Sequence, residues 1–370
     1  MEFGLTEFQQ MISNSSDEFL AQECQMEYVR EMETDSVGCT DVFWSQIVGQ
    51  GWTGIGIPEE YGGTGGDFLD LAVLLENTGK YLMPGPLFST VILGALTILD
   101  SGSDQQKSEW LPQISAGTLL VTMALLEESN SYDWKDVQTT AQLEGGKYRI
   151  CGNKLFVPYA HTAGLIIIPA KTENDNISLF AVDPNQNGVT VRPMDIMSSD
   201  KNSTVQLDDV VIEETSMLGE LNSGGVFFDR TFIRAVIAKC VQMTGSLSAC
   251  LDITLDYVKQ RSQFGRSIGT FQAIQHHCSN MAIDLEGSRH VAYQAAWALS
   301  NNIDASNSAH LAKAWINDAT QRISTLAHQS HGAIGFTHDY DLQMHTRWLK
   351  SQELLYGNNH YHKEKYLNII

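Results

Sequence analysis

The chain has 370 residues, of which 43% are hydrophobic and 18% charged, so it is neither a disordered tail nor a low-complexity chain. Lys and Arg number 23 against 44 Asp and Glu, which gives a formal net charge of −21. A surface this acidic repels a phosphate backbone, and no Lys/Arg-rich segment offsets it, so we expect no nucleic-acid partner.

The cysteines and the N-terminus predict the environment of the protein. The six cysteines form no C-x-x-C pair and no metal-ligand spacing, which is typical of reduced thiols and predicts no metal site. The first ten residues, MEFGLTEFQQ, lack the pattern of a secretion or transit signal. No apolar run approaches the roughly 20 residues that cross a bilayer. We therefore expect a cytoplasmic protein without a membrane span.

The first third of the chain has helical spacing. Apolar residues open one helix at 71–75 and continue through a second at 87–99. Before them lies the segment 58–66, which is too rich in glycine for a helix or a strand and is expected to be a loop. These patterns predict an N-terminal helical domain over residues 1–119.

Near residue 122 the pattern changes to short apolar or alternating runs separated by turn residues. Six runs read as strands: 148–151, 155–157, 165–168, 177–182, 189–191 and 205–212. Regular strands with short turns and no helical pattern between them are typical of an antiparallel sandwich or barrel. We therefore expect a middle β domain over residues 120–223.

The helical period returns after Gly224-Gly225. Apolar residues three or four apart continue for more than 25 residues and predict one long helix. Two further long helices are expected at about 272–301 and 306–331, and a final one from about 342. Long helices joined by short loops are typical of a four-helix bundle, here over residues 224–370. The fold class is therefore α+β with three domains.

Four features together resemble the acyl-CoA dehydrogenase family over essentially the whole chain. They are the loop Pro-Glu-Glu-Tyr-Gly-Gly at 58–63, the helical–β–helical order, Arg-Ser-Gln-Phe-Gly at 261–265 with Phe-Gln at 271–272, and Gln-Ser-His-Gly-Ala-Ile-Gly-Phe-Thr at 329–337. The resemblance implies a flavoprotein that removes two hydrogens across Cα–Cβ of an acyl-CoA thioester. A carboxylate takes the α-proton, and FAD accepts the β-hydride.

The resemblance also implies where the cofactor lies. FAD would sit between the β domain and the C-terminal bundle, with its adenosine-diphosphate arm crossing to a neighbouring subunit, and electron-transferring flavoprotein would be the acceptor. Arg261 would meet the pyrophosphate, because its planar fork matches two phosphate oxygens. The residues expected around this arm are Arg261, Phe264, Gln272, Gln329, Gly332 and Ala333.

The chain departs from the family at the catalytic base. The Glu of the family's Tyr-Glu-Gly-Thr stretch falls on Tyr356, and a phenol with a pKa of about 10 is a poor base near neutral pH. Some members place the Glu early in the long helix, where this chain has Ala235. The catalytic residue is therefore unknown.

The β-domain half of the flavin site departs too. Leu126 replaces the threonine of the family's Leu-Thr-Glu-Pro stretch, and Phe156-Val157-Pro158 replaces its aromatic-Ile-Thr stretch. Two hydroxyl donors are absent, and proline also lacks a backbone N–H. The glutamate of the first stretch is structural in the family, so we do not expect Glu127 or Glu128 to serve as a substitute base.

Residues that would serve a neighbour's flavin arm are thus retained, whereas those that would hold the chain's own flavin ring are not. This combination resembles the non-catalytic subunits of heteromeric acyl-CoA dehydrogenases, such as the pimeloyl-CoA type and those of steroid side-chain degradation. We expect a heterotetramer with two copies of each chain, in which a second acyl-CoA dehydrogenase-like subunit supplies the Glu. One alternative is a homotetramer with a displaced carboxylate, for example Asp229 or Asp341, and another is a scaffold that has lost its flavin.

Overall fold

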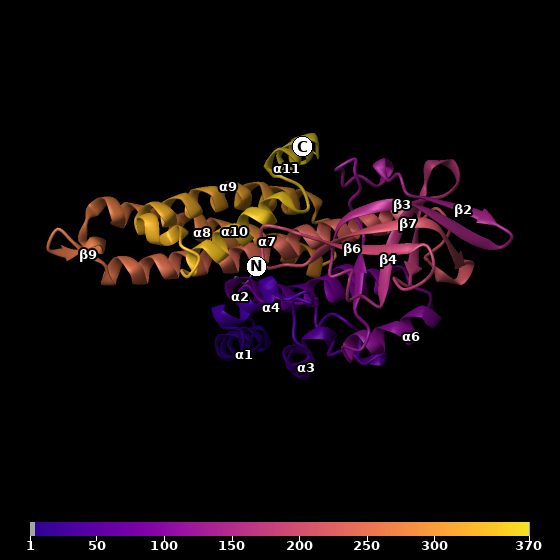
Figure 1. Ribbon diagram of the computed structural model, residues 1–370, viewed down its shortest axis with the longest axis horizontal. Helices are drawn as coiled ribbons and strands as arrows, with labels where there is room; N and C mark the ends of the chain where they lie inside the picture. The colour runs from indigo at the N-terminus through magenta and orange to yellow at the C-terminus, as the bar shows by residue number, and fades with distance from the viewer. Residues whose placement is uncertain (1–3, 370) are drawn as a thin grey trace.

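The computed structural model describes residues 4–369, which run through helices, then a sheet, then helices again (Figure 1). The molecule is elongated, with the sheet at one end and the tips of the long C-terminal helices at the other (Figure 1). The expected α+β fold class with its three parts is confirmed.

Short helices form the N-terminal part, and several begin at side-chain caps. Thr6, Asp67 and Ser103 each form a capping box, which satisfies the free N–H groups of the first helical turn. The helices are α1 (Glu7–Glu23), α2 (Met26–Thr34), α3 (Asp41–Gly49), α4 (Phe68–Lys80), α5 (Leu96–Ser101) and α6 (Asp104–Ser115).

Two segments of this part differ from regular helix. The expected glycine-rich loop contains only the short 3₁₀ turn Glu59–Tyr61. The expected helix at 87–99 is divided into the buried π-helical segment Ser89–Ala95 and the α-helix α5. Gly94 lies in this π-helical turn, and a Cβ on it would approach Val121 to 2.6 Å, so the strand β1 (Val121–Met123) packs directly on the turn.

The middle part is one eight-stranded sheet in which seven strands follow the order β6-β7-β3-β2-β4-β5-β8. Most neighbours pair antiparallel, as expected, but β1 pairs with β4 in parallel, and β2 meets β4 in parallel at a single residue pair. The runs 148–151 and 155–157 form one strand, because irregularities in its register interrupt the alternation without ending the pairing. The strands are β1 (Val121–Met123), β2 (Thr140–Glu144), β3 (Lys147–Pro158), β4 (Leu165–Lys171), β5 (Ile177–Val182), β6 (Val189–Met194), β7 (Asn202–Glu213) and β8 (Met217–Leu218).

The C-terminal part is built on α7, a helix of 37 residues. It crosses α4 at two glycines, since a Cβ on Gly79 would lie 1.8 Å from the carbonyl oxygen of Gln242, and one on Gly245 equally close to that of Glu76. The helices are α7 (Gly224–Gln260), α8 (Gln272–Ser300), α9 (Ser306–His331), α10 (Leu342–Leu354) and α11 (Asn359–Ile369), the last of which the sequence pattern did not separate.

Within residues 4–369, α7 has the length and apolar composition of a membrane-spanning helix. Of its most apolar 18-residue window, 83% is buried inside the chain. The apolar surface of α7 is therefore already covered by neighbouring helices, as in the core of a helical bundle.

A buried ion pair ties the sheet to the loop before it. The Lys154 Nζ lies 2.6 Å from the Glu127 Oε1, and neither side chain is more than 5% exposed. The same carboxylate accepts hydrogen bonds from Thr139 through its backbone N–H and its hydroxyl. Glu127 therefore holds the entry to β2 against β3, which supports its expected structural role.

We predict that the Lys154→Met substitution lowers the free energy of unfolding by about 3–5 kcal/mol, because it leaves the Glu127 carboxylate buried without a counter-charge. Adding Glu127→Gln should recover part of this loss, since the double variant buries no charge. Denaturant unfolding measures both. Lys147→Met is the control, because it breaks the exposed pair with Glu213 and should cost less than about 1 kcal/mol. Equal effects of the Lys154 and Lys147 variants would contradict the prediction.

Candidate functional site

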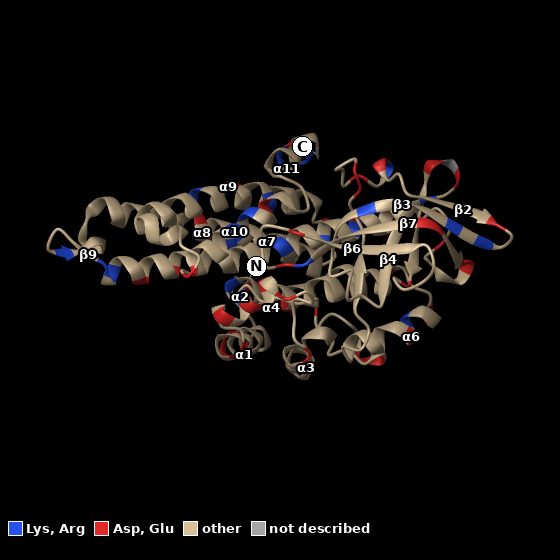
Figure 2. Ribbon diagram, viewed as in Figure 1, with Lys and Arg blue, Asp and Glu red and all other residues tan. Residues whose placement is uncertain are grey.

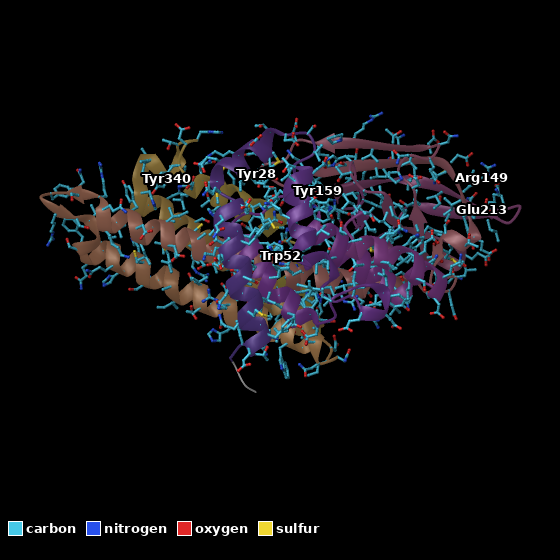
Figure 3. All side chains as sticks on the ribbon, turned by 90° about the horizontal axis from the view of Figure 1, so that it is seen from below. Tyr28, Trp52, Arg149, Tyr159, Glu213 and Tyr340 are labelled. Carbon is cyan, nitrogen blue, oxygen red and sulfur yellow. The ribbon has the colours of Figure 1, made fainter. Side chains whose placement is uncertain are left out.

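A small cavity lies where the three parts of the chain meet. Its lining comes from the segment before and within the π-helical turn, from the end of β3, from α7 and α10, and from the loop after α10. Tyr159, labelled in Figure 3, joins the N-terminal and middle parts, since its hydroxyl accepts a 2.7 Å hydrogen bond from the Gly85 N–H. The volume of this junction cavity is only about 40 Å³.

Lys239 of α7 enters the junction cavity from the helical side. Its side chain is buried, and its Nζ donates a 2.9 Å hydrogen bond to the Gln242 side chain. The ammonium lies 4.0 Å from the centre of the Phe88 ring and 5.6 Å from that of Trp348. Burial lowers the pKa of Lys239, and the charge of Asp200 opposes this shift. The side chain is thus held by one amide oxygen and two aromatic faces.

Tyr356 closes the cavity from the loop that follows α10. It is buried, its ring centre lies 6.0 Å from that of Phe88, and its φ of 57° is left-handed. Left-handed backbone is uncommon for a bulky residue and persists where the surroundings impose it. The Tyr356 N–H donates a 2.9 Å hydrogen bond to the Tyr132 hydroxyl.

Two buried histidines fix the other side of the Tyr356 loop. The His362 Nε2 lies 2.8 Å from the Tyr356 carbonyl oxygen, and its Nδ1 lies 2.8 Å from the Nδ1 of His310. Because a carbonyl only accepts, the His362 Nε2 carries a proton, and in the neutral ring its Nδ1 accepts from His310. Burial lowers the pKa of His310 to about 4 and that of His362 to about 2, so both rings are neutral at pH 7.

None of the carboxylates considered from sequence lies in the junction cavity. Asp229 is exposed, and partial desolvation together with the neighbouring Asp133 raises its pKa to about 6, but it does not line the cavity. Asp341 forms an ion pair with Arg30. Ala235 is buried in α7. The one carboxylate among the described lining residues is Asp200, which accepts a 2.6 Å hydrogen bond from the Gln352 side chain.

The residues expected around a cofactor arm lie far from this cavity, at the tip of the long helices (Figure 1). Arg261 follows the last residue of α7, and strands β9 (Ser262–Gln263) and β10 (Arg266–Ser267) form a hairpin there. No ion-pair partner of the Arg261 guanidinium is found within residues 4–369. Figure 2 shows Lys and Arg at this tip, whereas acidic residues gather on the N-terminal helices.

The turn of the hairpin exposes an aromatic ring. Phe264 and Gly265 both have positive φ, 55° and 76°, as a type I′ turn requires. Phe264 is 92% exposed. A bulky residue in a left-handed turn that is also open to water is unfavourable on both counts, and such features cluster at binding sites.

The second expected motif lies at the same end of the bundle. Tyr257 of α7 stacks on His331 at the end of α9, with ring centres 4.4 Å apart, and thereby brings the two motifs together. A Cβ on Gly332 would meet open space, and the φ of 66° alone accounts for the glycine. All six residues expected to contact the arm are exposed: Arg261, Phe264, Gln272, Gln329, Gly332 and Ala333.

Comparison with known proteins agrees with this architecture. Residues 6–118, 122–210 and 225–367 match the models of the acyl-CoA dehydrogenase N-terminal, middle and C-terminal domains. The chain is 31% identical to the probable acyl-CoA dehydrogenase YngJ of Bacillus subtilis over 97% of both chains. The chain belongs to the acyl-CoA dehydrogenase family. The resemblance stated from sequence is thus confirmed.

Two solved structures of the family are informative. The Tcur3481-Tcur3483 steroid ACAD is 27% identical, with a TM-score of 0.88 over 98% of this chain and 97% of that one. PigA with FAD and proline is 25% identical, with a TM-score of 0.92 over 100% and 99%. FAD is the cofactor of the family.

The junction cavity of this acyl-CoA dehydrogenase chain does not fit a flavin ring. Pockets for ligands of this size have volumes of about 300 Å³ or more, against about 40 Å³ here. Pro158, which lines the cavity, has no N–H to donate, and Leu126 offers only an apolar side chain. Arg261, in contrast, is exposed, and its planar guanidinium has the geometry that matches a pyrophosphate group.

Sequence reasoning missed two residues of opposite charge that line the cavity, Lys239 and Asp200. The signal for Lys239 is present, since it is the one charged residue in the apolar run 235–241 of α7. No comparable signal marks Asp200, which lies in an irregular polar segment between β6 and β7.

We predict that protonation of His310 and His362 lowers the free energy of unfolding by about 4–6 kcal/mol as the pH drops from 6.5 to 4. The folded pKa values of His310 and His362 lie below the ordinary 6.5, so the unfolded chain binds protons first. Denaturant unfolding across this pH range measures the slope. The double variant His310→Gln/His362→Gln should show a shallower slope than wild type, whereas exposed His360→Gln should not. An unchanged slope in the double variant would refute the assignment.

Proposed function

We propose that the chain is the non-catalytic subunit of a heteromeric, FAD-dependent acyl-CoA dehydrogenase, in which a second chain of the family supplies the catalytic Glu. When bound, FAD accepts the β-hydride of the acyl thioester. In this proposal, the present chain binds the pyrophosphate and adenosine arm of the partner's FAD through Arg261 and the hairpin. The substrate is an acyl-CoA.

The separation between the hairpin and the junction cavity carries this proposal. Arg261 lies 22 residues after Lys239, and 22 residues of α-helix rise about 33 Å. The hairpin therefore points away from the chain's own sheet and cavity (Figure 1). Residues at this position serve a site that another chain completes, which is why the hairpin is retained although the local cavity is closed.

The loss of the base supports the same proposal. Neither position that holds the catalytic Glu in the family carries a carboxylate here, since Tyr356 and Ala235 occupy them. The homotetramer alternative would require a carboxylate of this chain beside the reacting carbons, and Asp229 and Asp341 lie outside the cavity. Asp200 is the remaining candidate, and it is engaged by Gln352.

We predict that the chain purified alone carries little flavin and does not catalyse the reduction of added FAD by acyl-CoA. The reason is that it lacks both a cavity that fits the flavin ring and a catalytic base. Coexpression with a family member that has Glu at the Tyr356 position should give a yellow, active complex. Absorbance at flavin wavelengths and anaerobic reduction by acyl-CoA measure both states. If the chain purified alone binds one FAD per subunit and acyl-CoA reduces this FAD, the proposal is wrong and the homotetramer is favoured.

Arg261→Ala should weaken FAD binding to the active complex by about 10- to 100-fold, because a charge-assisted hydrogen bond contributes about 1.5–3 kcal/mol. Lys259→Ala is the matched control, since Lys259 is an exposed cation two residues away that pairs with Asp256. Equilibrium dialysis of FAD against each complex measures the change. Unchanged affinity in Arg261→Ala would favour a scaffold subunit instead.

A further inference from the structure

We propose that Lys239 is a plug that closes this chain's own junction cavity to a flavin ring and an acyl thioester, and so directs FAD to the partner's cavity. This inference rests on the proposed function and names the residue that distinguishes the two sites of the heteromer. Nothing in the motif comparison points to it, because Lys239 lies outside every motif.

The position of Lys239 on α7 aims it into the reaction space. It follows Ala235 by four residues, and residues four apart lie one turn apart on the same face of a helix. Ala235 occupies the position where some family members carry the catalytic Glu. The Lys239 side chain therefore extends along the face on which a base would meet the substrate.

The surroundings lock this side chain in one place. Gln242 accepts the 2.9 Å hydrogen bond from the ammonium and itself donates one of 2.9 Å to the Thr78 hydroxyl of α4. Phe88 and Trp348 present their ring faces to the same ammonium. No ion-pair partner of Lys239 is found in the described part of the chain. The aromatic faces and the amide oxygen replace water around the charge, so specific contacts hold the ammonium in this position.

Phe88 and Tyr356 complete the closure around Lys239. Phe88 is buried, and its ring centre lies 4.0 Å from the ammonium and 6.0 Å from the centre of the Tyr356 ring. Tyr132 and His362 hold the backbone N–H and carbonyl oxygen of Tyr356, and its side chain is buried. Restoring a Glu at position 356 would therefore not restore a site, because the space beside it stays filled.

Substitutions can separate the effect of the volume of the Lys239 side chain from the effect of its charge. Lys239→Met keeps a long unbranched side chain but removes the charge, so the cavity should remain closed. Lys239→Ala combined with Phe88→Ala removes both side chains that fill the space. Phe228→Ala is the matched control, since Phe228 is a fully buried aromatic residue of α7 that does not line the cavity.

Lumiflavin, which is the isoalloxazine ring without the nucleotide arm, is the probe for the opened cavity. Titration into the full chain alone, followed by quenching of flavin fluorescence, should show about tenfold tighter binding by Lys239→Ala/Phe88→Ala than by wild type, through stacking on the remaining aromatic rings. Lys239→Met and Phe228→Ala should bind like wild type. Circular dichroism verifies folding, and the single variant Lys239→Ala, with a smaller gain, replaces the double variant if that one unfolds.

The outcomes separate this inference from the proposed function. If the opened variants bind lumiflavin no better than Phe228→Ala, Lys239 is not the plug, although partner-dependent activity of the wild-type complex would leave the proposed function standing. If Lys239→Met also gains binding, the charge rather than the volume excludes flavin, and the plug as stated is wrong. If wild type alone binds one FAD per chain and is reduced by acyl-CoA, the proposed function fails first.

Discussion

Helix α7 crosses α4 so closely that only glycine fits at Gly79 and Gly245, and the remaining architecture follows from this contact. The crossing fixes the rotation of α7, so that the face with Ala235 and Lys239 turns toward the sheet and the π-helical turn. Its length carries the chain from the sheet to the hairpin. Helix α7 therefore determines both which side chains enter the junction cavity and how far Arg261 lies from that cavity.

The loop that would hold the catalytic base keeps its support although the base is absent. Tyr132, His310 and His362 hold the Tyr356 backbone in a left-handed conformation. Such strain persists only where neighbours impose it, and it is typical of functional sites. The frame of an active site has thus been retained, while a buried phenol fills the place of the carboxylate. Packing and chemistry can be separated in this loop, because they reside in different side chains.

Most of the fold was predictable because its signals are local. The strand runs at 165–168, 177–182 and 205–212 and the long helices after Gly224 appear where the hydrophobic period places them. The parallel pairing of β1 with β4 was not predictable, because strand neighbours depend on contacts between residues far apart in the chain. Arg261 and Phe264 were singled out by their motif, and their role in binding a cofactor stays a prediction; the lack of a Glu at positions 356 and 235 could be read directly from the sequence. Lys239, Phe88 and Asp200 were not singled out, because no motif joins three residues from three separate elements.

By itself, the sequence determined the order of helical and β segments, the family, and the absence of a Glu at the two usual positions. These properties can be recognised from the local hydrophobic periodicity and from short sequence motifs. Only the tertiary structure decided that the cavity is closed and that the hairpin points away from it. The junction cavity is closed because several side chains together fill its volume. These side chains approach one another only after α7, α10 and the segment before the π-helical turn have packed. Distance between two sites is likewise set by the rigid helix between them and not by any residue type.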